Sequence, residues 1–430
     1  MKRLPAFLLL LAHISTTLPA ATLQNTLHMA HPRAMPRSEI MADGRILVLG
    51  GSDSAGPVNS VEIYDPEKKV WIEGVPMGEP RHLFTLTRLR NGTYLVTGGF
   101  NGSRASASVE AFDPSIPKWT AKTPMREGRY SHTATLLPDG RVLIAGGSDD
   151  LRGKGTAEIY DPKADSWSPA GTMSITDRLW HTATLIGGDR VLVVGSPTSP
   201  VCEVYNVTNN TWSVVGSLAE VRSRHSAVML KGGNVMVVGG MDQLTSTSRV
   251  SAEVFDPLKG TWSSAGALSV PRHFATALGD GNGHIFVIGG HNEGHGAVES
   301  VEMFSIGTGK WETVAGLSLR ADGGTGLLLP SGSLFIAGGS IASGFSSSAR
   351  LLVLPAPPND ADYDGLSFFE EIVMGYDPFD EDTGGTGISD ASKDWDNDGF
   401  SNLYEIKMAS RSATMTAPPG KSVTPPKSGK

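Results

Sequence analysis

Short apolar runs recur along most of the chain, and glycine closes each of them. The runs lie at residues 46–49, 95–97, 142–145, 191–194, 235–238, 285–288 and 334–337. Six of them are followed by a glycine pair, and the fourth is followed by Gly195 and Ser196. Runs of this length that are apolar at every position predict strands buried on both faces. A glycine pair lets two backbones approach where a Cβ atom would collide. Successive copies lie about 44 to 50 residues apart, a period typical of repeated supersecondary units.

Each copy also predicts a tight turn and three further strands. Asp43-Gly44 and Asp139-Gly140 precede two of the apolar runs and suit hairpin turns, because both residues tolerate positive φ. After a variable loop, a glutamate and an aromatic residue two positions later fall on one face of a strand. These pairs are Glu62/Tyr64, Glu110/Phe112, Glu158/Tyr160, Glu203/Tyr205, Glu253/Phe255 and Glu302/Phe304. A third strand carries Trp71, Trp119, Trp167, Trp212, Trp262 or Trp311. A fourth is introduced by Arg81, Arg129, Arg178, Arg222, Arg272 or Arg320, with Arg37 in the N-terminal copy.

Together, the glycine pairs and the tryptophans resemble the kelch repeat from about Thr26 to Pro355. The resemblance implies an all-β fold, a seven-bladed β-propeller in which each repeat is a four-stranded blade. The last copy contains only two strands, near 334–339 and 350–354, whereas residues 22–27 and 36–41 align with a third and a fourth strand. We therefore predict that the N-terminus closes the last blade, which leaves no open sheet edge in the ring.

The glutamate and arginine series predict ion pairs. We expect each glutamate to pair with the arginine that follows it by about 18 to 20 residues, such as Glu110 with Arg129 and Glu253 with Arg272, because a buried charge needs a partner. Recurrence in nearly every blade favours a structural role over a single site. A ring of anion-binding arginines is the alternative.

Histidines and one tryptophan offer candidate chemistry. His132, His181 and His225 each follow an arginine of the series by three residues. Three histidines could bind zinc, but a position repeated once per blade favours a hydrogen-bonded strand histidine. Trp180 interrupts the pattern beside His181, and it is interpreted either as a platform for stacking a sugar or as ordinary packing.

The N-terminus predicts export. Lys2 and Arg3 precede a mostly apolar run at 4–12, and small residues follow at 19–21, a pattern typical of a signal peptide cleaved near Ala20 or Ala21. A disordered leader is the alternative. No stretch is long enough to span a membrane as a helix, so we expect a soluble protein. From the leader we expect it to be secreted, periplasmic or at the cell surface. We also expect a monomer. Cys202 is the only cysteine, which excludes an intrachain disulfide, and we expect it to pack as a small apolar residue.

Negative charge is concentrated near the C-terminus. Residues 359–405 contain 14 acidic residues and one lysine, a net charge of −13 within a chain whose total is −8. The remainder therefore carries +5, spread over more than 350 residues. Nothing in this distribution indicates a basic nucleic-acid surface.

Two loops in the acidic segment have the spacing of a calcium site. Oxygen ligands at positions 1, 3, 5 and 12, a backbone carbonyl at position 7 and a glycine at position 6 suit a hard cation that takes six to eight oxygens. The first loop offers Asp360, Asp362, Asp364, Leu366 and Glu371, and the second offers Asp394, Asp396, Asp398, Phe400 and Glu405. The pattern D-x-D-x-D-G-x-S-x-x-E-E with a trailing G-x-D-P resembles the calcium-binding type 3 repeats of thrombospondin, as found in bacterial secreted proteins. An acidic linker is the alternative.

These patterns predict four parts: a signal peptide at 1–21, the propeller at 22–355, a calcium-binding segment at 356–410 and a disordered tail at 411–430. The resemblance to kelch propellers leaves two functions open. The first is a non-enzymatic binding protein whose loops take a protein or glycan ligand, with calcium as the stabilising ion. The second is a carbohydrate-active enzyme similar to galactose oxidases or sialic-acid epimerases. The oxidases use a cysteine crosslinked to a tyrosine, a pairing not expected for Cys202 inside a repeated strand. No residue set stands apart from the repeats as a catalytic constellation, so the binding protein is favoured.

Overall fold

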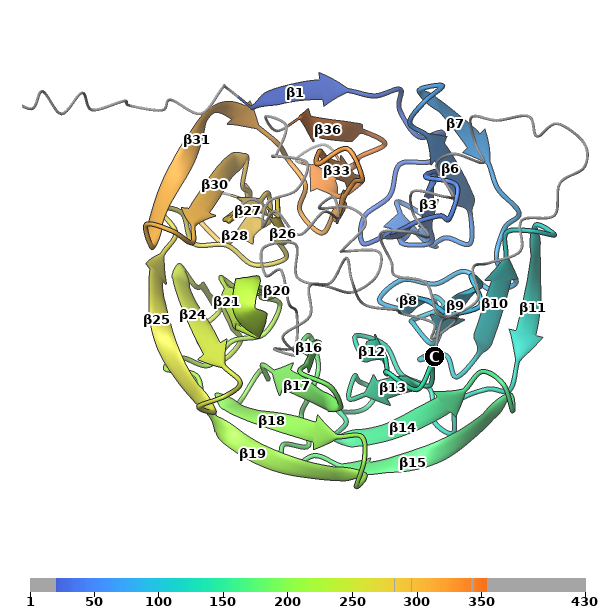
Figure 1. Cartoon of the computed structure of the whole chain (residues 1–430). Helices are drawn as coiled ribbons and strands as arrows, with labels where there is room; N and C mark the ends of the chain where they lie inside the picture. The colour runs from blue at the N-terminus through green and yellow to red at the C-terminus, as the bar shows by residue number, and fades with distance from the viewer. Residues whose placement is uncertain (1–20, 282, 295, 342–343, 354–430) are drawn as a thin grey trace, which may run out of the picture. The chain divides into compact units, whose positions relative to one another are not determined.

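The computed structural model describes residues 21–281, 283–294, 296–341 and 344–353, and these form seven four-stranded antiparallel sheets around a central axis (Figure 1). This confirms the predicted all-β, seven-bladed propeller. The helical content of the described residues is one 3-10 turn, η1 (Lys231–Gly233). No helix in this part of the chain is both long enough and apolar enough to cross a membrane. The predicted signal peptide, apart from Ala21, and both predicted calcium loops lie outside the described residues.

The strands of each blade run in order from the innermost, beside the axis, to the outermost at the rim. Blade one contains β2 (Arg37–Ile40), β3 (Ile46–Leu49), β6 (Val61–Asp65) and β7 (Val70–Glu73). Blade two contains β8 (Thr85–Arg88), β9 (Tyr94–Thr97), β10 (Val109–Asp113) and β11 (Lys118–Lys122). Blade three contains β12 (Thr133–Leu136), β13 (Val142–Ala145), β14 (Thr156–Asp161) and β15 (Ser166–Thr172). Blade four contains β16 (Thr182–Ile186), β17 (Arg190–Val194), β18 (Val201–Asn206) and β19 (Thr211–Ser217).

The other three blades follow the same order. Blade five contains β20 (Ser226–Met229), β21 (Val235–Val238), β24 (Ser251–Asp256) and β25 (Thr261–Ala267). Blade six contains β26 (Thr276–Gly279), β27 (His284–Ile288), β30 (Ser300–Ser305) and β31 (Lys310–Ser318). Blade seven contains β32 (Thr325–Leu328), β33 (Leu334–Ala337), β36 (Ala349–Val353) and β1 (Thr22–Asn25).

The predicted grouping of strands differs from the observed blades by one strand, because the predicted fourth strand of each copy belongs to the next blade. The tryptophan strand is the outermost strand, and the strand introduced by arginine is the innermost strand of the next blade. The N-terminal prediction is therefore half right. β1 pairs with β36 and closes blade seven, as expected, but β2 pairs with β3 and opens blade one. The ring is closed because the two ends of the propeller meet in one sheet (Figure 1).

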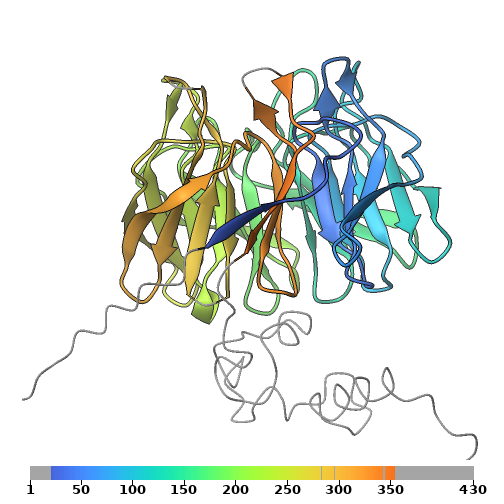
Figure 2. The ribbon, with the colours of Figure 1, turned by 90° about the horizontal axis from the view of Figure 1, so that it is seen from above.

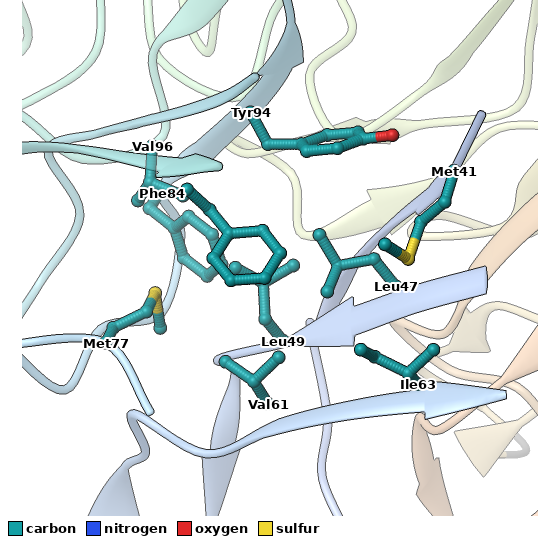
Figure 3. Close-up of a cluster of buried hydrophobic side chains, with 10 residues drawn as sticks. Met41, Leu47, Leu49, Val61, Ile63, Met77, Phe84, Tyr94 and Val96 are labelled. Carbon is teal, nitrogen blue, oxygen red and sulfur yellow. The ribbon is translucent and has the colours of Figure 1, made fainter. Parts of the chain in front are cut away.

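Apolar side chains fill the space between neighbouring sheets. Between blades one and two, Leu47 and Leu49 of β3 face Phe84, Tyr94 and Val96, all buried (Figure 3). Each strand apolar at every position thus packs on both faces, as its sequence predicted. At the rim, the tryptophan lies against the aromatic residue opposite it in register, and its indole N–H in five blades donates to the previous blade. These bonds are Trp71 to Leu27 O, Trp119 to Val75 O, Trp167 to Thr123 O, Trp212 to Ala170 O and Trp311 to Ala265 O.

The glycine pairs lie where a loop of the next blade crosses them. Gly98 has φ 59°, and a Cβ atom there would lie 2.4 Å from the carbonyl oxygen of Arg129. Gly99 donates its N–H to that same carbonyl. Both the conformation and the close approach require glycine, which confirms the prediction made for these pairs.

Four short hairpins extend the loops that follow the glycine pairs. They are β4 (Ser52–Asp53) with β5 (Gly56–Pro57), β22 (Met241–Asp242) with β23 (Thr247–Ser248), β28 (His291–Asn292) with β29 (Gly296–Ala297), and β34 (Ser340–Ile341) with β35 (Gly344–Phe345). Figure 2 shows the blue β4–β5 and orange β34–β35 hairpins standing on the same face of the ring. The variable loops of the repeats therefore gather on one face.

Candidate functional site at the mouth of the channel

Seven crossover loops meet around the axis on this face. A crossover loop is the segment that joins the outermost strand of one blade to the innermost strand of the next. Each contains one residue in the left-handed conformation, two positions after the repeated arginine or its counterpart. These residues are Met35, Leu83, Ser131, Trp180, Arg224, Phe274 and Gly323, with φ between 52° and 62°. We call them the mouth ring.

Backbone hydrogen bonds join neighbouring members of the mouth ring. The N–H of Arg224 donates to Trp180 O at 2.8 Å, and the N–H of Phe274 donates to Arg224 O at 2.9 Å. Four more bonds of this kind link Ser131 to Leu83, Trp180 to Ser131, Gly323 to Phe274 and Met35 to Gly323. A left-handed backbone costs a residue with a side chain about 1–2 kcal/mol. Because the left-handed conformation recurs in all seven crossover loops, it is a feature of the fold and not a local distortion. The backbone is thus the same all round the ring, while the side chains differ in size and charge.

Trp180, Arg224 and Phe274 form a cluster on one side of the ring. The ring centroids of Trp180 and Phe274 lie 5.0 Å apart at an interplanar angle of 71°. The Arg224 guanidinium carbon lies 5.1 Å from each of these centroids, so the cation touches both aromatic faces. Its Nη1 donates to Met241 Sδ at 3.2 Å, and its buried Nε has no hydrogen-bond partner among the described residues. All three side chains of this mouth cluster are half-buried.

Two histidines with carboxylates adjoin the mouth cluster. His273 lies 5.2 Å from Phe274 and 5.3 Å from His291, measured between ring centroids. His273 Nδ1 lies 3.3 Å from a Glu293 oxygen, and His291 Nδ1 lies 3.2 Å from Asp322 Oδ2. Burial lowers the pKa of His273 to about 4 and raises the pKa of the Asp322 carboxyl. At neutral pH His273 is therefore an uncharged hydrogen-bonding group.

A second aromatic group lies on blades two and three. His82 stacks on Phe100 with ring centroids 5.6 Å apart, and Phe100 meets Tyr130 edge-on at 5.9 Å. His82 and Tyr130 each precede a member of the mouth ring by one residue and bridge to the loop that follows a glycine pair. Burial lowers the pKa of His82. Aromatic surface therefore lines both sides of this face.

The repeated glutamates and arginines are ion pairs, but the predicted partners are wrong. The partner of Glu110 is Arg81, at 2.5 Å, and not Arg129. The partner of Glu253 is Arg222, at 2.7 Å, and not Arg272. In every case the partner is the arginine that precedes the glutamate, because the crossover loop belongs to the blade that it enters. The other pairs are Arg33–Glu62, Arg129–Glu158, Arg178–Glu203 and Arg272–Glu302.

Arg37 and Arg320, which the sequence placed in the arginine series, do not occupy this position. Arg33 takes it in blade one, and Ala321 takes it in blade seven. The six paired arginines are at most 2 % exposed. They hold the blades together and offer no free anion-binding ring.

His132, His181 and His225 serve the structure. Each is buried, and its Nε2 lies within hydrogen-bond distance of a threonine on the innermost strand of the preceding blade, as in His181 to Thr133 at 2.9 Å. Burial lowers the pKa of His181 and of His225 to about 3, so both are neutral at pH 7. Among the described residues, no group of three or more His, Cys, Asp or Glu could hold a metal ion. The zinc interpretation therefore has no support in this part of the chain.

Cys202 packs as the sequence predicted. It is fully buried in a cluster that includes Ile186, Val194 and Val235, and its Sγ lies 3.5 Å from Pro200 O. Burial raises the pKa of the thiol to about 12, so it is not a nucleophile at neutral pH. No tyrosine belongs to this cluster of described residues. The cysteine–tyrosine pairing of the oxidase alternative thus finds no partner in the cluster.

The sequence had singled out only one member of the mouth cluster. Trp180 was noted because it breaks the repeat, whereas Arg224, Phe274, His273 and Asp322 were missed. One signal could have found the ring members, since all lie two residues after the repeated arginine or its counterpart. The predicted calcium ligands, from Asp360 to Glu405, all lie outside the described residues.

Comparison with known proteins supports the repeat and the fold. Five segments match the Kelch motif, at residues 41–78, 91–126, 129–174, 222–269 and 281–318. No curated protein matches the sequence. Among solved structures, a fungal alcohol oxidase of the AA5 family in complex with copper is 18 % identical, with a TM-score of 0.67 over 81 % of this chain and 79 % of that chain. The structure of YjhT is 16 % identical, with a TM-score of 0.52 over 67 % of this chain and 99 % of that chain. At these identities the likeness shows the fold alone.

Proposed function

Because this chain is a seven-bladed propeller of kelch repeats, we propose that it is a non-enzymatic binding protein that takes a protein or glycan ligand at its mouth cluster. The observation that carries the proposal is the arrangement of Trp180, Arg224 and Phe274 on one ring of loops joined by backbone hydrogen bonds. Kelch propellers are scaffolds for interaction, and the seven mouth-ring positions share a backbone while their side chains differ. Such a surface can change its ligand without disturbing the fold.

The chemistry of the mouth cluster favours a ligand that carries a carboxylate beside an apolar face. A guanidinium binds carboxylates through paired N–H donors. An aromatic face accepts the C–H face of a sugar or an apolar side chain. An acidic glycan or an acidic peptide could pair with the Arg224 guanidinium and lie against Trp180 at once.

A binding screen tests this proposal. The full-length protein is applied to arrays of neutral and acidic glycans and of acidic and basic peptides, beside the Arg224→Met variant. Methionine keeps most of the side-chain length and removes the charge. We expect hits among the acidic members that Arg224→Met loses. Hits confined to neutral or basic members, or hits retained by the variant, would refute the assignment of the site.

A second candidate function is a carbohydrate-active enzyme, and one observation supports it. Asp322, with a raised pKa, lies 3.2 Å from His291, and such a pair could exchange a proton with a bound ligand. Against an enzyme, the six repeated arginines and glutamates are closed in ion pairs and supply no catalytic group to the mouth. Incubating each hit with the protein and following it by NMR distinguishes the two. A new chemical species that the Asp322→Asn variant fails to produce would establish the enzyme.

We also propose that the acidic segment binds calcium through the two loops at 360–371 and 394–405. The support is the sequence spacing alone, with two matched sets of oxygen ligands in one short stretch. The proposed role is to stabilise the segment, and it is independent of the ligand at the mouth. Export, as the N-terminal sequence predicts, would expose these loops to extracellular concentrations of calcium.

A further inference from the structure

Blade seven departs from the other six blades at the ion pair. In each of the other six blades the repeated arginine offers its carbonyl to a glycine pair, or to Ser196, in the previous blade, as when Gly240 N–H donates to Arg272 O. In blade seven the same bond runs from Gly290 to Ala321, so alanine occupies the arginine position. Strand register places Arg350 opposite Ile336, where Glu302 lies opposite Val287 in blade six. The arginine is lost, and the glutamate is replaced by a cation.

The crossover loop into blade seven is also shorter. In blade six, Leu268 donates its N–H to Val250 O, and the arginine follows four residues later. The corresponding bond before blade seven runs from Leu319 to Glu299 O, and Ala321 follows after only two residues. The loss of the arginine side chain and the shortening of the crossover loop both remove atoms from the region beside Ala321. The side chain that fills this region elsewhere is missing, and so are two residues of the loop that covers it.

A cavity of about 520 Å³ lies at this place in blade seven, and its lining includes Arg350 of β36 and His28, which follows β1. Polar side chains line most of it, including Arg320, Arg350 and a run of serines from Ser346 to Ser348. Ser348 corresponds to Ser108 of blade two, because each accepts from a glycine pair through its carbonyl. Ser108 Oγ receives a hydrogen bond from Arg81 at 2.9 Å, and no arginine stands in the position to do the same for Ser348.

The charges of the cavity do not cancel. Arg320 is paired with Glu299, which also accepts from the hydroxyl of Ser318. Arg350 donates one bond, from Nη1 to Ser318 O at 3.2 Å, and it has no carboxylate partner among the described residues. A blade that had merely lost its pair would be stabilised by apolar residues at these two positions. The chain instead places a cation and hydroxyls around a hollow large enough for a small molecule.

We propose that the cavity of blade seven is a second ligand site, which takes a small oxyanion, a carboxylate or a phosphate, carried on a hydroxylated molecule. Arg350 would bind the oxyanion, because its guanidinium keeps most of its donors free. The serines from Ser346 to Ser348 would exchange hydrogen bonds with hydroxyl groups of the ligand. This site lies outside the mouth ring and does not depend on the function proposed there.

Calorimetric titration of the full-length protein with two probes tests the site. Inorganic phosphate and glucuronate represent the two sources of the oxyanion. We expect saturable binding of at least one probe, and at least tenfold weaker binding by the Arg350→Gln variant. Saturation by phosphate alone indicates a phosphorylated ligand, and saturation by glucuronate alone indicates a sugar acid. Arg104→Gln, at an exposed arginine outside both sites, should bind both probes as the wild type does.

A rebuilt ion pair gives an independent check. The double variant Ala321→Arg with Arg350→Glu restores the residues of the other six blades, so its new arginine should fill the cavity and abolish binding of both probes. Thermal melting shows whether the double variant folds. If it does not fold, the affinity of Arg350→Gln for the two probes tests the site alone. Absence of saturation by either probe, or unchanged binding by Arg350→Gln, would overturn the proposal.

Discussion

Arg81 and Glu110 lie 2.5 Å apart inside blade two, and their side chains are 0 % and 10 % exposed. The same guanidinium donates to Gly98 O at 2.8 Å, so one arginine ties the crossover loop to two strands of the blade. The Glu110 carboxylate also accepts the N–H of Gly78 at 2.8 Å. This relationship recurs in six blades and explains why the series is so regular.

Removing one partner of this pair should be costly. Glu110→Ala leaves the buried charge of Arg81 with only the partly exposed carboxylate of Glu79, 3.3 Å away, and we expect a loss of about 3–5 kcal/mol in the free energy of unfolding. Urea denaturation measures it. A double-mutant cycle then separates the two candidate partners, because Glu110→Ala should couple strongly with Arg81→Met and add independently with Arg129→Met. The reverse coupling would restore the pairing that the sequence first indicated.

That pairing shows where sequence reasoning reaches its limit. The period near fifty residues predicted seven blades correctly, because each apolar run and each glycine pair marks one blade. The period does not say where a blade begins. Glu110 has one arginine 29 residues before it and another 19 residues after it, and only the crossover of the chain between blades decides between them.

The mouth was harder still to predict. Its cluster combines Trp180, Arg224 and Phe274 from the loops into blades four, five and six, and these residues share no type. They share a left-handed backbone conformation at one position of the repeat, and the amino-acid sequence does not reveal this conformation. A site built where the repeats differ leaves no motif. The calcium loops are the opposite case, since their signal is entirely one of spacing.

Buried histidines should make the propeller sensitive to acid. His181 and His225 have pKa values of about 3 in the folded protein, against 6.5 for an ordinary histidine, because burial disfavours the charged form. The unfolded chain therefore binds protons first, and the free energy of unfolding should fall as the pH drops from 6.5 toward 3. The slope is up to about 1.4 kcal/mol per pH unit for each histidine.

Denaturation at a series of pH values checks this dependence. His181→Gln should flatten the curve between pH 6 and 4, because glutamine does not titrate. His28→Gln, at an exposed histidine, should leave the shape unchanged. If the two variants show the same pH dependence, the buried histidines are not its source.

Gly98 should resist substitution more strongly than Gly92. Both have positive φ, at 59° and 81°, so alanine is strained at either position. A Cβ atom on Gly98 would lie 2.4 Å from Arg129 O, whereas nothing lies within 4 Å of one on Gly92. We expect Gly92→Ala to cost about 1–2 kcal/mol from conformation alone and Gly98→Ala to cost clearly more. Equal melting temperatures for the two variants would show that the crossing of loop and glycine pair is not tight.

Calcium should stabilise the C-terminal segment and leave the propeller unaffected. The two loops bring up to eight carboxylates together, and these repel one another without a cation. At about 1 mM free calcium, a dissociation constant near 10⁻⁴ M would contribute roughly 1.4 kcal/mol per site. Calorimetry should find about two sites, and Asp362→Asn with Asp396→Asn should remove most of the heat.

Limited proteolysis offers the matching control. Chelation should open residues 359–405 to protease while it spares the propeller, which has its own core. Calcium binding by the double variant as tight as that of the wild type would place the ions elsewhere or reduce the segment to an acidic linker.

The central claim is that the ligand binds at the mouth cluster, and calorimetric titration of the best ligand from the arrays tests it most directly. We expect the affinity to fall at least tenfold in Trp180→Ala and in Arg224→Met, because each removes a face or a charge that the ligand contacts. It should stay unchanged in Leu258→Ala, which alters an exposed residue on the rim, 93 % accessible to solvent. Wild-type affinity in both mouth variants, provided that they melt as the wild type does, would contradict the account.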